Sequence, residues 1–175
     1  MVEELQTYLL RSFFHDFGAT PHQELATKFP GAFLMTSFRK TPPLISHLRR
    51  KEDFTLLVGS DDDADLEFMM DPTLEPEHCR IVWHTGFRGW TVEDLGTSFG
   101  TAVQGERLES SRPVLLTDKD VIKVGGGLLQ LQFYAAETLF GRMTQAGVTR
   151  TVTRLLARKA REKQAEGSKE EQAEG

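Results

Sequence analysis

Between Phe33 and Tyr134 the sequence consists of short apolar or alternating segments separated by turn residues, and this pattern constrains the fold more than any other feature. Such segments, four to seven residues long, are typical of β-strands and too short for ordinary helices. Nine of them without an intervening helix predict an all-β domain built as a sandwich or barrel. The predicted strands cover residues 33–38, 54–59, 64–69, 78–84, 89–94, 101–104, 112–116, 120–124 and 128–134.

The last two predicted strands are separated by Gly125-Gly126-Gly127. Glycine tolerates the positive φ that tight hairpin turns require, so we expect a β-hairpin here. A phosphate-binding loop is excluded because the P-loop spacing and its Lys-Ser/Thr ending are absent.

Helical patterns flank this region on both sides. In residues 1–31, Val2, Leu5, Leu9, Phe13 and Phe17 follow the helical period, which predicts an amphipathic helix followed by a connector over 18–31. The helix either packs on its own domain or serves for docking or dimerisation. Both alternatives stay open at this point.

The C-terminal segment 136–164 returns to the helical period, and the apolar face changes near Gly147, where we expect a break or kink. Arg150, Arg154, Arg158 and Arg161 form one side of a basic arm that is either solvated or contacts anionic partners. Residues 165–175 are low in complexity, and we expect them to be disordered.

Charge and cysteine content limit the function classes. Residues 51–134 hold 7 basic and 16 acidic residues, a net charge of −9, so nucleic acid is not expected as a partner. The single cysteine, Cys79, cannot form an internal disulfide or a cysteine-based zinc site, which favours a reducing, cytoplasmic compartment. We expect neither export nor a membrane span, since the N-terminus has no basic signal region and no apolar run approaches 18 residues.

Five sequence blocks occur in a fixed order within the β-rich region. They are VGS at 58–60, ADLEF at 64–68, LEPEH at 74–78, WTVEDLGTSFGT at 90–101 and LLTDKDVIKVG at 115–125. In this order and spacing they resemble the forkhead-associated (FHA) domain. The resemblance implies an eleven-stranded β-sandwich over residues 32–135, flanked here by N- and C-terminal α-helices. It also implies that loops at one end bind phosphothreonine peptides.

The residues that would hold a phosphothreonine depart from the family pattern. Ser60 stands where the family has Arg, Glu75 replaces the Ser of its Ser-Arg-x-His block, Pro76 replaces the Arg of that block, and Phe99 replaces the Asn before Gly-Thr. Phosphate needs donors and positive potential, whereas Asp61, Asp62, Asp63 and Glu75 add negative charge beside these loops. We therefore expect ordinary phosphothreonine binding to be lost, unless Arg88 or a bridging divalent cation restores it.

The predicted partner-binding loop face carries His78 as a structural residue and Phe99 as either an exposed apolar anchor or a cap folded onto the sandwich. Phe87, beside Arg88, extends the apolar patch in this hypothesis. The complete predicted set is Ser60, Asp61, Glu75, His78, Arg88, Phe99, Gly100 and Thr101.

We predict no catalytic residues, metal or cofactor. Asp61, Asp63 and Asp65 alternate as at the start of a calcium loop, but the Gly at its sixth position and the Glu at its twelfth are absent. We do not expect an enzyme, because the sequence shows no nucleophile paired with a base, no set of metal ligands and no nucleotide-binding loop.

The sequence thus predicts a non-enzymatic interaction module in signalling or scaffolding that binds a protein partner without phosphothreonine. Its compact layout suggests a bacterial origin. One alternative is a phosphothreonine-peptide reader with an atypical pocket that acts downstream of Ser/Thr kinases. Another is a structural module that forms a homo-oligomer by pairing its terminal helices.

Overall fold

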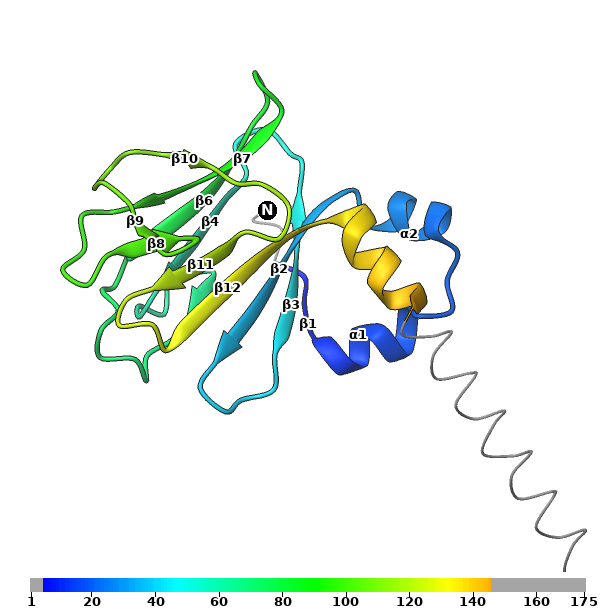
Figure 1. The fold of residues 1–175 in the computed structure, drawn as a ribbon, viewed down its shortest axis with the longest axis horizontal. Helices are drawn as coiled ribbons and strands as arrows, with labels where there is room; N and C mark the ends of the chain where they lie inside the picture. The colour runs from blue at the N-terminus through cyan, green and yellow to red at the C-terminus, as the bar shows by residue number, and fades with distance from the viewer. Residues whose placement is uncertain (1–4, 146–175) are drawn as a thin grey trace, which may run out of the picture.

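The strands form two sheets that pack face to face (Figure 1). Alternate side chains along the strands are apolar and fill the space between the sheets. The computed structural model describes residues 5–145. The first sheet runs in the order β1 (Thr7–Leu9), β3 (Leu44–Arg49), β2 (Gly31–Phe38), β12 (Leu129–Ala135), β11 (Val121–Val124), β8 (Thr101–Val103) and β9 (Glu106–Arg107). The second runs β10 (Val114–Leu115), β7 (Gly89–Asp94), β6 (Cys79–His84), β4 (Thr55–Gly59) and β5 (Leu66–Glu67).

The main core lies between the two sheets. On β12, Leu129, Leu131 and Phe133 point into this core, where they meet residues such as Ile81 and Trp90 of the second sheet. β11 and β12 pair antiparallel, with Val124 opposite Leu129, around the three glycines. The predicted sandwich and its glycine hairpin are therefore confirmed.

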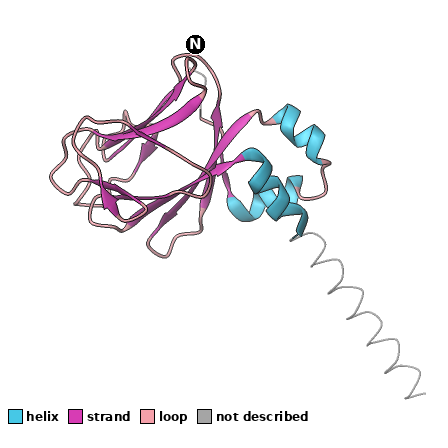
Figure 2. Cartoon of the chain, turned by 45° about the horizontal axis from the view of Figure 1, so that its top comes forward, coloured by secondary structure: helices cyan, strands magenta, loops and turns pink. Residues whose placement is uncertain are grey.

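A second apolar cluster packs on the outer face of β2, β3 and β12 in the seven-stranded sheet. It is made by a helical cap that comprises α1 (Leu10–Phe17), α2 (His22–Lys28) and the helical residues 136–145 (Figure 2). Phe13 and Phe140 are fully buried here against Phe33 of β2. The N-terminal amphipathic helix thus packs on its own chain, which was the first of the two alternatives.

The structure of residues 5–49 differs from the sequence prediction in three places. Residues 7–9, expected to be helical, form β1 and pair with β3, so the helix begins only at Leu10. The predicted connector 18–31 contains α2, and β3 was not predicted. The described residues contain twelve strands, one more than the eleven expected. At eight residues and without a side-chain N-cap, α1 owes its stability to packing and not to helix propensity.

The predicted kink near Gly147, the arginine face and the tail over 165–175 lie outside the described residues. Within 5–145, no helix is long and apolar enough to cross a membrane.

Candidate partner-binding loop face

Three loops meet at one end of the sandwich and form the loop face, which we define as residues 60–65, 68–78 and 95–100. The first two loops touch directly, since the Ser60 N–H donates to the Glu75 carbonyl at 3.0 Å. A Cβ on Gly59 would lie 1.8 Å from the Pro76 carbonyl oxygen, so this close approach requires glycine. The Ser60 hydroxyl donates to the Leu74 carbonyl at 3.2 Å and is already used within the chain.

The third loop is shaped by the buried carboxylate of Asp94 at the end of β7. Its Oδ2 accepts the N–H groups of Gly96 and Thr97, and its Oδ1 accepts the hydroxyls of Thr97 and Thr101. Burial raises the pKa of Asp94, but these hydrogen bonds outweigh it and hold the pKa below its usual value. An ionised Asp94 therefore fixes the loop from Leu95 to Thr101.

His78 connects this loop to the loop before β6. The ring is fully buried, its Nδ1 accepts the Glu75 N–H at 3.2 Å, and its Nε2 lies 3.0 Å from the Gly100 carbonyl. Thr97 Oγ1 lies 3.1 Å from the same nitrogen. These contacts agree with the predicted structural role of His78.

The side chain of Glu75 crosses from the second loop to the third. Its Oε1 accepts the Ser98 N–H at 2.8 Å and the Ser98 hydroxyl at 2.9 Å. These hydrogen bonds, the backbone one first, hold the pKa of Glu75 below its usual value. The N–H and the hydroxyl of Ser98 are thus already bonded to a carboxylate of the same chain.

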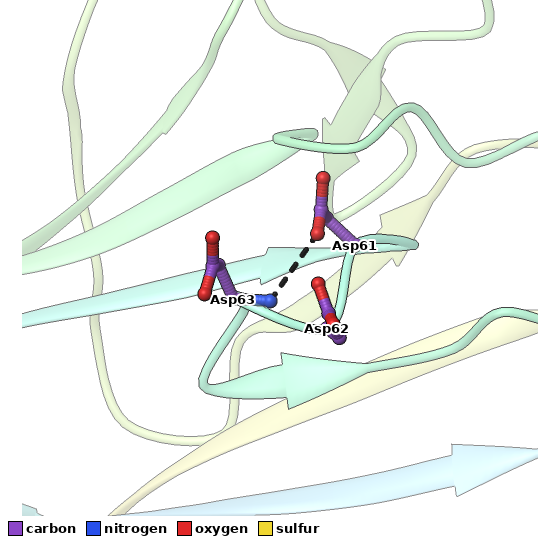
Figure 3. Close-up of side chains that lie close together, drawn as sticks. All are labelled: Asp61, Asp62 and Asp63. Carbon is purple, nitrogen blue, oxygen red and sulfur yellow. Dashed lines mark hydrogen bonds between the residues drawn. The ribbon is translucent and has the colours of Figure 1, made fainter.

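Asp61, Asp62 and Asp63 are exposed on the β4–β5 loop (Figure 3). The Asp63 N–H donates to Asp61 Oδ1, and the hydrogen bond between Asp61 and Asp62 lowers the pKa of Asp61 and raises that of Asp62. Asp65 points elsewhere, since its Oδ2 accepts the Leu57 N–H at 2.7 Å. The alternating aspartates at 61, 63 and 65 therefore do not form one set of ligands.

Phe99 lies at the tip of the third loop and is 54% exposed, which settles the question left open by the sequence. The following Gly100 has φ +76°, and Thr101 is buried with its hydroxyl on Asp94. Phe99 is thus a projecting apolar side chain on a rigid loop.

Arg88 and Phe87 are not on the loop face, which corrects their proposed place beside Phe99. They lie in the β6–β7 hairpin, next to the pair His84 and Gly89. The third loop starts after Asp94, at the other end of β7, about 17 Å away at 3.3–3.4 Å per residue. Arg88 therefore cannot restore phosphate binding there.

Two further residues contribute to this face and were not predicted from the sequence. Ser98 carries the donors that Glu75 uses, and Arg107 Nη2 donates to the Ser98 carbonyl at 3.1 Å. Arg107 comes from β9, which is only two residues long and gave no detectable strand pattern.

Residues 56–125 match the family model of the FHA domain. This β-sandwich is an FHA domain. FHA domains are non-enzymatic protein-interaction modules.

Solved structures agree with this fold. The FHA domain of the CT664 protein from Chlamydia trachomatis is 23% identical with a TM-score of 0.50, over 60% of this chain and 98% of that one. The N-terminal FHA domain of Rad53p from S. cerevisiae, solved with a phosphothreonine peptide, is 18% identical with a TM-score of 0.52, over 63% and 97%. A comparison with curated proteins finds no match.

Proposed function

We propose that this FHA domain binds a protein partner through its loop face without requiring phosphothreonine, as a cytoplasmic signalling or scaffolding module of bacterial type. The observation that carries the proposal is the pair of hydrogen bonds from Ser98 to the Glu75 carboxylate. Glu75 stands at the serine position of the family motif, so a carboxylate occupies the place where a phosphate-binding hydroxyl is expected.

Electrostatics support the same conclusion. An incoming phosphate would meet Glu75 together with the exposed carboxylates of Asp61, Asp62 and Asp63. Ser60 offers no positive charge at the family's arginine position, and its hydroxyl is used by Leu74. Phosphate recognition depends on charge-assisted donors, and this face supplies like charges instead. The exposed Phe99 suits an uncharged contact.

Phosphothreonine reading remains the second candidate because one guanidinium, that of Arg107, does reach the third loop. The third candidate, pairing of terminal helices between chains, receives less support. Among the described residues, Phe13 and Phe140 of the helical cap are buried within the chain, so these two side chains are not available to a second copy.

A phosphopeptide comparison tests the proposal. Matched peptide pools with phosphothreonine or threonine at a fixed central position are titrated into the full chain by fluorescence anisotropy. We expect no preference for the phosphorylated pool. The double variant Ser60→Arg with Glu75→Ser frees the Ser98 donors and adds the missing cation, so it should gain a preference of about tenfold or more.

The proposal would be overturned if the unmodified chain bound the phosphorylated pool with a micromolar Kd and bound the unphosphorylated pool more weakly. The variant Ser12→Ala, at an exposed position of α1, is the control for substitution as such. Light scattering on the full chain tests the third candidate, which requires a dimer.

A further inference from the structure

Beside the loop face lies a groove of about 430 Å³ that opens onto the outer side of the seven-stranded sheet. It is lined by Phe99 and Gly100 of the third loop, by Thr101 and Ala102 of β8, and by the glycine hairpin. Its size falls within the range of ordinary ligand sites.

The register of three strands places two cations in the groove. Ala102 of β8 is directly opposite Arg107 of β9 and directly opposite Lys123 of β11. Residues in such a cross-strand row point to the same face of the sheet. Val103 and Ile122, their neighbours along the strands, are buried in the core between the sheets, so Arg107, Ala102 and Lys123 face outward.

The glycines keep this groove open. A Cβ on Gly100 would lie 2.7 to 2.8 Å from the guanidinium atoms of Arg107, so the guanidinium lies directly on the loop backbone. Gly125 and Gly127 have positive φ values of 64° and 88°, which favour glycine, and neither places a side chain over Lys123.

The groove is positively charged within an acidic part of the chain. Residues 51–134 carry a net charge of −9, yet the groove is lined by Arg107 and Lys123 and by no Asp or Glu. Among residues 5–145 neither cation forms a salt bridge, and the contact of Arg107 is to a carbonyl. Both charges are therefore available to a ligand.

We infer that this groove binds an extended acidic segment of a protein partner, with two carboxylates at alternate positions and an apolar side chain on Phe99. This inference deepens the proposed function and rests on it. Arg107 and Lys123 are two strand spacings apart, about 9.5 Å between their Cα atoms. Alternate side chains of an extended peptide are about 7 Å apart on one face, which long cationic side chains can match.

Two separated carboxylates fit this arrangement better than one compact phosphate group. Arg107 Nη2 already donates to the Ser98 carbonyl. The Glu75 carboxylate accepts the N–H and the hydroxyl of the same Ser98. A dianion at this place would meet that carboxylate with twice the charge of an aspartate. A phosphothreonine ligand is therefore an outcome of the test and not the proposal.

The test uses the full chain and four fluorescein-labelled pools of nine-residue peptides with one random background. The pools differ only at two alternate central positions, which are Asp, Asn, Lys or phosphothreonine. We expect the Asp pool to bind about tenfold more tightly than the Asn pool, with a preference that weakens as salt is raised.

The deciding variant is Lys123→Glu, which changes an exposed side chain and should abolish the preference for Asp or turn it toward Lys. Arg11→Glu on α1 is the matched control, because it changes the net charge equally at another exposed site and should keep the preference. Phe99→Ala should weaken binding of every pool. Circular dichroism verifies that each variant is folded.

Two results would overturn the inference and separate it from the proposed function. Absence of an Asp preference, or its survival in Lys123→Glu, overturns the acidic ligand and leaves phosphate independence standing. Tightest binding of the phosphothreonine pool overturns both.

Discussion

The buried ring of His78 is hydrogen-bonded to the Gly100 carbonyl, 3.0 Å from Nε2, and so connects two loops that are 22 residues apart in the chain. Because Nδ1 accepts the Glu75 N–H, Nε2 carries the proton and donates it. One imidazole thus accepts from the Glu75 N–H and adds a hydrogen bond to the Gly100 carbonyl, which also accepts the Gly125 N–H at 3.0 Å. The position of Glu75, and with it the carboxylate on Ser98, depends on this ring.

Replacing His78 by alanine should destabilise the chain by about 1–3 kcal/mol, since the Glu75 N–H loses its acceptor and the Gly100 carbonyl keeps only the Gly125 N–H. The free energy of unfolding is measured by urea denaturation. His15→Ala is the control, because the His15 side chain is 83% exposed, and its effect should stay within about 0.5 kcal/mol. Equal stabilities of the two variants would show that His78 has no bracing role.

Ser98→Ala should raise the pKa of Glu75 toward its usual value but not fully to it. The substitution removes the hydroxyl donor at 2.9 Å and leaves the backbone N–H at 2.8 Å in place. Carboxyl ¹³C chemical shifts followed over pH measure this pKa directly. An unchanged Glu75 titration would mean that the hydroxyl contact does not form in solution, whereas Ser12→Ala should leave the titration unaltered.

Phe13→Ala should lower the free energy of unfolding by about 3–5 kcal/mol, the usual cost of removing a fully buried phenyl ring. Phe13 contacts four other rings of the cluster, with centroid distances of 5.0 Å to Phe17, 5.3 Å to Tyr8, 5.4 Å to Phe29 and 5.5 Å to Phe33. Thermal or urea unfolding gives the value. Phe99→Ala, a matched phenyl deletion at an exposed site, should cost less than about 0.5 kcal/mol, and a similar loss in both variants would contradict the packing of the cap.

The sequence predicts a strand best where the period of its apolar residues matches the alternation of buried and exposed side chains. β12 alternates Leu129, Leu131 and Phe133 into the core, and this alternation is visible in the sequence. β1 was missed because its three residues lie within a helical pattern, and only pairing with β3 decides their conformation. Tertiary hydrogen bonding overrides local propensity in such short segments.

The loop face shows the same limit. The motif located His78 and Phe99 correctly, because both are fixed by spacing along the chain. The contact between Glu75 and Ser98 joins residues 23 positions apart, and the cross-strand row of Arg107 and Lys123 depends on register. Arg88 was misplaced because a linear sequence does not show at which end of a strand a loop lies.

The last prediction concerns His47, whose ring is 2% exposed and packs against Phe29 and Phe33 of the second cluster. Burial is the main cause that lowers the pKa of His47 from 6.5, with Arg49 adding to it and the Pro30 carbonyl opposing it. Below pH 6.5, His47 is therefore protonated more readily in the unfolded chain than in the folded chain. The stabilisation is complete above that pH and decreases as the pH falls.

Between pH 7.5 and 5.5 we expect the unmodified chain to lose up to about 1 kcal/mol more stability than His47→Gln, which cannot titrate. The glutamine amide can still donate to the Pro30 carbonyl, which His47 Nε2 contacts at 3.0 Å, so the variant removes the titration with little loss of the hydrogen bond. Urea denaturation of both proteins at the two pH values measures the difference. The remaining histidines are present in both proteins and cancel, so parallel losses would show that His47 is protonated as easily in the folded chain as in the unfolded one.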